Sequence, residues 1–318
     1  MSEILPLLLG GLVLFLYAIA RLSSVLRDVF DERAKRMIER STDRLVLSVL
    51  IGTVLTILLG SSSAVIILTI VFINAGTLRF AQAVGIVLGA NIGTTFSSQV
   101  ISLDIGQYAV IPMILGLAID VLARSDRWTR RGDILLYFGM LFFGLFAMEQ
   151  SVAPLRDSPA FLEWMSRIGD SAVLGAAVGG LVTLVIQSSS GTVGMAIVLG
   201  KQNILSLAGG VAVMLGAEIG TCSDTLLATI KGNRQALKTG LFHLVFNGTT
   251  IALGLALFQP FVELVDWISG EAPLGRRIAN AHVLFNVLGV VLMLPLVRPA
   301  VQLFDRVLPD RGQRCRSR

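Results

Sequence analysis

Long apolar runs, separated by short polar breaks, make up most of this sequence. The runs cover residues 4–20, 45–73, 80–96, 108–123, 134–148, 171–200, 205–221, 239–258 and 278–297. Runs of this length suit membrane-spanning helices, whereas the strands of a membrane barrel have about 10 residues and alternate apolar with polar positions. The pattern therefore predicts an all-α integral membrane protein that crosses the lipid bilayer several times.

Composition supports this fold class and narrows the partners. Hydrophobic residues make up 54% of the 318 positions, charged residues only 15%, and the mean hydropathy is +0.79. Soluble domains rarely combine these values. The pI is near 9.7, but the Lys and Arg residues flank the apolar runs, where they orient membrane helices, so we expect no nucleic-acid partner. Cys222 lies in an apolar run and Cys315 in a polar tail, so no disulfide framework is predicted.

The chain contains an internal duplication. A shift of 127 residues places Ser61, Ser62 and Ser63 on Ser188, Ser189 and Ser190, and, without a gap, residues 89–94 (GANIGT) on residues 216–221 (GAEIGT). Over residues 56–94, 15 of 39 positions are identical. A looser match at a shift of 129 residues adds the first apolar run to the repeated unit. We expect two halves, residues 1–131 and 132–258, followed by a final transmembrane helix and a basic tail in residues 259–318.

The basic residues orient these halves. Lys and Arg gather in residues 21–44, 124–131, 231–238 and from 298 onwards, which places these segments and the C-terminus in the cytoplasm. If each serine stretch is the tip of a re-entrant helical hairpin, five of the 26 basic residues lie outside: Arg156, Arg167, Lys201, Arg276 and Arg277. Three full spans then separate the hairpins, so the halves are inverted copies. Inverted repeats with broken helices are typical of secondary transporters, which hold substrate near the midplane.

The two serine stretches are the first candidate site. A bend at membrane depth leaves backbone amides and carbonyls unpaired unless protein or a water-filled cavity satisfies them. Free amides at a helix start suit an anion, and hydroxyls with carbonyls and Gln187 suit Na⁺. Serines also occur simply as small residues that let helices pack closely. Their occurrence at matched positions of both halves favours a substrate site.

The second repeated signature adds candidate cation ligands. GANIGTT and GAEIGTC supply oxygen atoms for Na⁺, and no transition metal is expected. These candidates for sodium binding or coupling are Asn91, Thr94, Thr95, Glu218 and Thr221. A carboxylate such as Glu218 within a span is costly and indicates function, although a glutamate near a helix end can also reach the membrane surface. Asp224 lies nearer a basic loop, where a solvated or salt-bridged role is as good an interpretation as substrate contact.

Two further patterns have simpler interpretations. His243 begins HLVFN and His282 begins HVLFN, so each histidine has an asparagine one helical turn later. Such pairs usually tie helices together through hydrogen bonds, and ligand contact is the less favoured alternative. Residues 23–43 alternate apolar and charged positions at helical spacing, which predicts an interfacial amphipathic helix on the cytoplasmic face.

These motifs resemble the type II sodium/phosphate cotransporter family. The match rests on QSSSGT, GANIGTT, the inverted copies and AHVLFN, and covers nearly the whole chain. The resemblance implies a phosphate and sodium site at Ser61, Ser62, Ser63, Gln187, Ser188, Ser189 and Ser190. Gly60 stands where the family usually has glutamine, and Glu218 where it usually has asparagine. The chain also lacks the PhoU-related regulatory domain that many bacterial relatives carry after the last helix.

The resemblance implies a symporter in the cell (inner) membrane that imports inorganic phosphate with Na⁺ as the coupling ion, and no other cofactor. Transport of another oxyanion and proton coupling through Glu218 remain alternatives. A channel would need a continuous polar lining, whereas the polar residues cluster at two breaks. An intramembrane hydrolase is not expected, because no serine lies in a G-x-S-x-G elbow and His243 has no carboxylate at a recognisable spacing.

Overall fold

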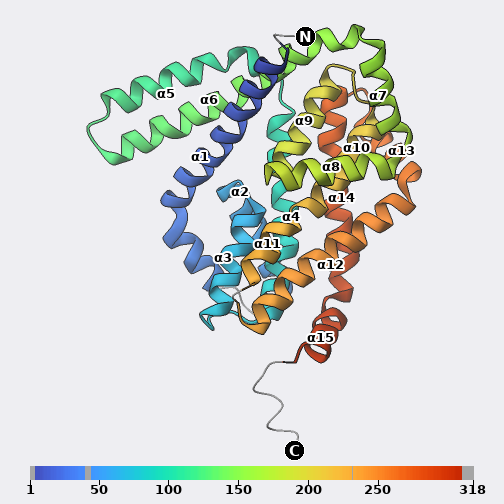
Figure 1. Ribbon diagram of the computed structural model, residues 1–318. Coiled ribbons are helices and arrows are strands. Elements are labelled where there is room, and N and C mark those ends of the chain that lie inside the picture. The colour runs from blue at the N-terminus through green and yellow to red at the C-terminus, as the bar shows by residue number, and fades with distance from the viewer. Residues whose placement is uncertain (1–3, 40–43, 231, 310–318) are drawn as a thin grey trace, which may run out of the picture.

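All regular elements that the computed structural model describes, over residues 4–39, 44–230 and 232–309, are helices (Figure 1). The α-helices are α1 (Ile4–Glu39), α2 (Leu45–Leu59), α3 (Ser62–Asn74), α4 (Phe80–Ile101), α5 (Val110–Leu122), α6 (Asp126–Val152), α7 (Pro159–Asp170), α8 (Ala172–Ile186), α9 (Ser189–Lys201), α10 (Leu207–Gly220), α11 (Cys222–Thr229), α12 (Arg234–Ala256), α13 (Phe258–Ser269), α14 (Leu274–Met293) and α15 (Val297–Val307). Short 3-10 helices cover Gly106–Tyr108, Ala153–Asp157 and Leu294–Leu296. The all-α prediction is confirmed.

Six helical segments within the described residues are long and apolar enough to cross a membrane. They are Ile4–Leu26, Phe80–Ile101, Asp126–Leu155, Leu207–Thr229, Arg234–Ala256 and Leu274–Val307. A seventh candidate is formed by α7 and α8 together, which bend by 105° at Ser171. The full span expected over residues 108–123 is wrong in length, because α5 has only 13 residues, or about 20 Å, against a hydrocarbon core of about 30 Å.

The helical run is broken at both serine stretches in the same way. Gly60 ends α2 with φ 65° and ψ 13°, and Gln187 ends α8 with φ 55° and ψ 33°, both in the left-handed region. The following serines are extended, with φ −153° at Ser61 and −151° at Ser188, and they cap α3 and α9. Left-handed backbone at a helix C-terminus followed by an N-capping serine reverses the chain within two residues. The repeated sequence therefore folds into a repeated turn.

Each half also repeats one helix interface. Gly89 of α4 lies against the backbone of α2, where an added Cβ would overlap the Val49 carbonyl oxygen. Gly216 of α10 lies against α8, where a Cβ would overlap the carbonyl oxygen of Ala176. Both members of the second pair lie 127 residues after those of the first, the same shift that aligns the serines. The α2–α4 and α8–α10 interfaces are thus built alike, and glycine is required there because the backbones touch.

The two hairpins open at opposite ends of α14. The first hairpin, α2 and α3, opens beside the start of α4, which adjoins α15 beyond the C-terminal end of α14 (Figure 1). The second hairpin, α8 and α9, opens beside the start of α10, where Gly200 and Gly210 both face Ile278 in the first turns of α14. A 20-residue helix such as α14 is about 30 Å long. The hairpins therefore enter the fold from opposite sides and point their serine tips toward each other.

The expected segment boundaries differ from the helices. The boundary at residues 131/132 falls inside α6, and residues 259–318 hold α13, α14 and α15 in place of a single final helix. The expected interfacial helix over residues 23–43 continues α1 as far as Glu39, while residues 40–43 lie outside the described residues. In Figure 1, α1 and the α5–α6 pair form an arm beside the other helices, joined where Phe15 of α1 packs with Phe142 of α6 in one buried cluster.

Candidate functional site

The tips of the two hairpins share one cavity of about 740 Å³. α1 supplies a third wall, with Tyr17 and Ser23 among its lining residues. From the tips and α10–α11 the cavity is lined by Gly60, Ser61, Ser62, Ser63, Gln187, Ser188, Ser189, Ser190, Thr221 and Asp224. All seven residues expected at the substrate site from the serine motifs thus lie together, although each triplet comes from a different half of the chain.

The cavity faces the N-termini of two helices. The N–H of Ala64 donates to Ser61 Oγ (3.2 Å) in α3, and the N–H of Gly191 donates to Ser188 Oγ (3.0 Å) in α9. The first serine of each triplet is therefore used as a cap. The second and third serines begin the helix, where backbone N–H groups have no partner within the helix. Two positive dipole ends and four serine side chains thus meet at this cavity.

The tip residues Gly60 and Gln187 differ in chemistry but share a backbone conformation. Left-handed backbone is free of strain for glycine, whereas a non-glycine residue pays for it. Gln187 adopts it while its Nε2 donates to the carbonyl of Leu184 (2.6 Å). A Cβ at position 60 would come within 3.1 Å of Ser23 Oγ on α1. The glycine that departs from the family pattern is thus compatible with the turn and with the close approach of α1.

The hairpins also differ in how they are held. In the second, the hydroxyls of Thr183 and Thr192 lie 2.7 Å apart and join α8 to α9. The matching positions of the first are Thr56 and Val65, so Thr56 Oγ1 is buried and has no hydrogen-bond partner among the described residues. The first hairpin therefore lacks one link that fixes the second.

Asp224 is the one carboxylate among the described residues that line the cavity. Ser223 Oγ donates to its Oδ1 (3.2 Å), and Ser63 Oγ of the other half donates weakly to its Oδ2 (3.4 Å). The sequence left this residue between a solvated role and a substrate role. Its distance of 161 positions from Ser63 hid the contact, and only its position three residues after GAEIGT indicated that it could reach the site.

The expected sodium ligands do not gather at the cavity. Thr221 lines it, with its hydroxyl donating to the carbonyl of Ala217 (3.1 Å). Asn91, Thr94 and Thr95 are buried on α4, where their side chains donate to carbonyls of the same helix at 2.7 to 3.0 Å. Own-helix hydrogen bonds are the usual way for such side chains to be satisfied within an apolar helix. Their proposed role at a cation stays a prediction.

Glu218 belongs to a separate buried chain of hydrogen bonds. Its Oε1 lies 2.6 Å from Nε2 of His282 on α14, and the Nδ1 of that histidine lies 2.6 Å from Ser98 Oγ on α4. Glu218 is 5% exposed and His282 is fully buried. Charged groups removed from water need such partners. The chain connects α10 of the second half to α4 of the first half through α14.

His243 is fixed in a parallel way. Its Nδ1 lies 2.9 Å from Thr225 Oγ1, the residue 127 positions after Ser98. Because Thr225 already donates to the carbonyl of Cys222, it accepts from His243, whose Nε2 can then accept from Asn247 Nδ2 (3.3 Å). Both histidines thus join helices through a hydroxyl, as the favoured interpretation of the two His–Asn pairs expected.

Comparison with known proteins places this architecture. A family model described as Na⁺/Pi-cotransporter matches residues 14–150 and 157–266. The chain belongs to the Na⁺/Pi-cotransporter family. The resemblance drawn from the serine and GANIGTT motifs is thereby confirmed, and a member of this transporter family is a transport protein and not an enzyme.

Individual relatives extend over nearly the whole chain. "Uncharacterized protein YqeW" of Bacillus subtilis is 28% identical over 312 residues, covering 96% of this chain and 99% of its own length. "Putative inorganic phosphate export protein YjbB" of Escherichia coli is 23% identical, and its Salmonella typhimurium namesake 22%; each match covers 96% of this chain. The chain spans only 56% of the length of those two proteins. No solved structure matches significantly.

Proposed function

We propose that this protein is a secondary transporter that moves inorganic phosphate together with Na⁺ across the cell membrane, with the cavity between the two serine tips as its substrate site. The observation that carries the proposal is the meeting of two helix N-termini, each with a repeated serine triplet, at one cavity. Membership of the Na⁺/Pi-cotransporter family supports phosphate and sodium as the two solutes.

The cavity suits an oxyanion because it offers donors without basic side chains. Backbone N–H groups at the starts of α3 and α9 and the hydroxyls of Ser62, Ser63, Ser189 and Ser190 can all donate to phosphate oxygens. Among the described residues that line the cavity none is a lysine or an arginine. A tightly held cation of the protein would retain the anion, whereas neutral donors bind it and let it leave on either side.

The charge at the cavity favours a co-transported cation. Each helix N-terminus contributes about +0.5 charge, while phosphate carries between about one and two negative charges near neutral pH and Asp224 adds one more. Taken together, one to two negative charges remain without a partner in a region of low dielectric constant. One or two Na⁺ ions beside Asp224, Ser63 and Thr221 would offset them, which ties phosphate movement to the sodium gradient.

The hairpins and halves would then have the inverted arrangement of secondary transporters. We infer that both hairpins are re-entrant and that the halves are inverted copies. The identical turns, the matched glycine interfaces and the opening of the hairpins at opposite ends of α14 support this inference. The span count used in the sequence argument is weaker support, because α5 is too short to be counted as a full span without tilt or distortion of the bilayer.

Cysteine labelling tests the inversion. Thr77 follows the open end of the first hairpin and Asn203 that of the second, and both are exposed. In a background with Cys222→Ala and Cys315→Ser, Thr77→Cys should react with an impermeant thiol reagent only from the cytoplasm, and Asn203→Cys only from outside. Reaction of both cysteines from one face of intact cells would rule out inverted halves.

The direction of transport has a second candidate. An inward Na⁺ gradient would drive phosphate import by symport, whereas the relatives from Escherichia coli and Salmonella typhimurium bear the printed name of inorganic phosphate export proteins. A second coupling ion also has a specific observation in its favour, because Glu218 pairs with His282 outside the cavity lining, as a proton-carrying pair would. Transport assays with defined gradients distinguish these possibilities.

The deciding experiment uses the purified full chain in proteoliposomes with radiolabelled phosphate. An inward Na⁺ gradient should concentrate phosphate inside the vesicles, and an equal K⁺ gradient should not. Loading the vesicles and reversing the Na⁺ gradient should drive phosphate out, so the same assay measures both directions. Uptake that follows a pH step but ignores Na⁺ would replace sodium with proton coupling, and the absence of phosphate movement under every gradient would contradict the proposal.

A further inference from the structure

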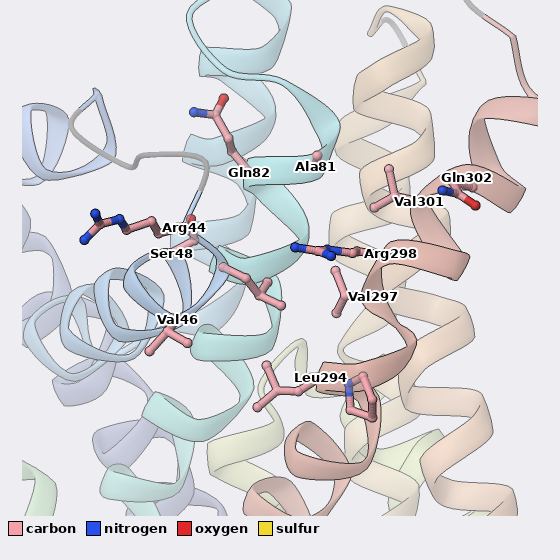
Figure 2. A pocket seen from close by; sticks show the side chains of 12 residues that line it. Arg44, Val46, Ser48, Ala81, Gln82, Leu294, Val297, Arg298, Val301 and Gln302 are labelled. Atoms are coloured by element: carbon pink, nitrogen blue, oxygen red, sulfur yellow. The ribbon is translucent and has the colours of Figure 1, made fainter.

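A second pocket, of about 890 Å³, lies far along the chain from the serine residues, between the starts of α2 and α4 and the helix α15. Its polar lining residues are Arg44, Ser48, Gln82, Arg298 and Gln302, and its described lining contains no carboxylate. The remaining lining is apolar, including Val46, Leu294 and Val297. Figure 2 shows Arg298 reaching from α15 toward α2 and α4, with Val297 and Val301 beside it.

We propose that this pocket binds the headgroup of an anionic phospholipid. Two guanidinium groups without an acidic neighbour in the lining match a lipid phosphate, because Arg recognises phosphate through paired donors. Basic pockets between membrane helices on the cytoplasmic side are the usual sites for acidic headgroups. The pocket lies at the end of the molecule that leads into the basic C-terminal tail, the end expected to face the cytoplasm.

An apolar path for the acyl chains starts at the same pocket. Val46 lines it and is also exposed on the outer surface of α2. Leu50, Val54 and Ile57 follow on that face of α2 and are likewise exposed. These residues recur at helical spacing, so they form one apolar stripe from the pocket toward the middle of the helix. A free phosphate ion would make no use of such a stripe, whereas a phospholipid would bury its chain along it.

The wall formed by α15 is held in place by contacts from its other face. Lys238 Nζ of α12, itself buried, donates to Asp305 Oδ1 (2.6 Å), and Arg234 Nη1 donates to the carbonyl of Pro309 (2.9 Å). The Phe304 ring packs against Phe80 with ring centres 5.5 Å apart. A wall fixed on one side leaves Arg298 and Gln302 available on the other, so the pocket is preformed for its ligand.

The test is native mass spectrometry of the full chain in detergent with equal amounts of phosphatidylglycerol and phosphatidylcholine. The wild type should retain phosphatidylglycerol selectively. Arg298→Gln should weaken that retention about fivefold, the usual contribution of one basic residue. Arg306→Gln is the matched control, since Arg306 is exposed on the same helix and does not line the pocket. Val46→Gln should weaken retention of the lipid by making its acyl path polar.

Three outcomes would overturn the proposal. They are equal retention of the two lipids by the wild type, equal losses in the Arg298 and Arg306 variants, and complete displacement of phosphatidylglycerol by millimolar inorganic phosphate, which would identify a site for the free ion. Circular dichroism of each variant separates loss of the lipid from loss of the fold.

Discussion

Replacing Ser189 by alanine should abolish sodium-dependent phosphate uptake while the protein still folds. Ser189 begins α9, lines the cavity and is 8% exposed. The cap of α9 is the preceding residue, Ser188, so the variant keeps the helix start intact. It removes one donor to the anion in a site that has no basic side chain to compensate. Loss of a hydrogen bond to a charged group costs about 1.5 to 3 kcal/mol, or roughly 10- to 150-fold in affinity.

The equivalent change in the other half, Ser62→Ala, should be similarly severe, because Ser62 begins α3 at the same cavity. Ser151→Ala is a suitable control, since this serine is equally buried but lies on α6, where its hydroxyl donates to the carbonyl of Met148. Proteoliposome uptake measures all three variants. Normal transport by both Ser62→Ala and Ser189→Ala would make the hairpins packing elements and remove the proposed phosphate site.

The sequence predicted the parts of this fold that repeat. A shift of 127 residues aligned the serines and the glycines, and the same shift relates the turns at Gly60 and Gln187 and the contacts of Gly89 and Gly216. Such features are local, because a turn or a glycine interface depends on a few residues near it in the sequence. Convergence of the triplets was predictable for another reason, since inverted repeats place matched elements at one centre.

The features that the sequence missed depend on contacts between distant segments. Asp224 meets Ser63, and His282 joins Ser98 to Glu218, across 161, 184 and 64 positions. No periodicity links such positions in one sequence. The length of α5 was missed for a different reason. Apolar composition marks a segment as suited to the membrane, but it does not show where a helix starts, and residues 102–109 form turns and a short 3-10 helix instead.

The role of Glu218 can be separated from that of Asp224 by two conservative variants. The sequence favoured a sodium ligand at Glu218, but its Oε1 is 2.6 Å from His282 Nε2, and Glu218 is not among the residues lining the cavity. Asp224 is among them and meets Ser63. We therefore expect Asp224→Asn to weaken the Na⁺ dependence of uptake, because it removes the carboxylate that the cation would neutralise.

Glu218→Gln should flatten the pH dependence of uptake between about pH 5 and 8, the range in which histidine commonly titrates, and leave the Na⁺ dependence nearly unchanged. The glutamine can still accept from His282 Nε2, so the connection between α10, α14 and α4 persists while the proton-accepting carboxylate is gone. Phosphate recognition should also persist, because the serine tips are untouched. Uptake by both variants is measured over a grid of pH and Na⁺ concentration. A loss of Na⁺ affinity in Glu218→Gln would restore the sodium role that the sequence favoured, and a wild-type response to both ions would leave Glu218 as a structural contact between the halves.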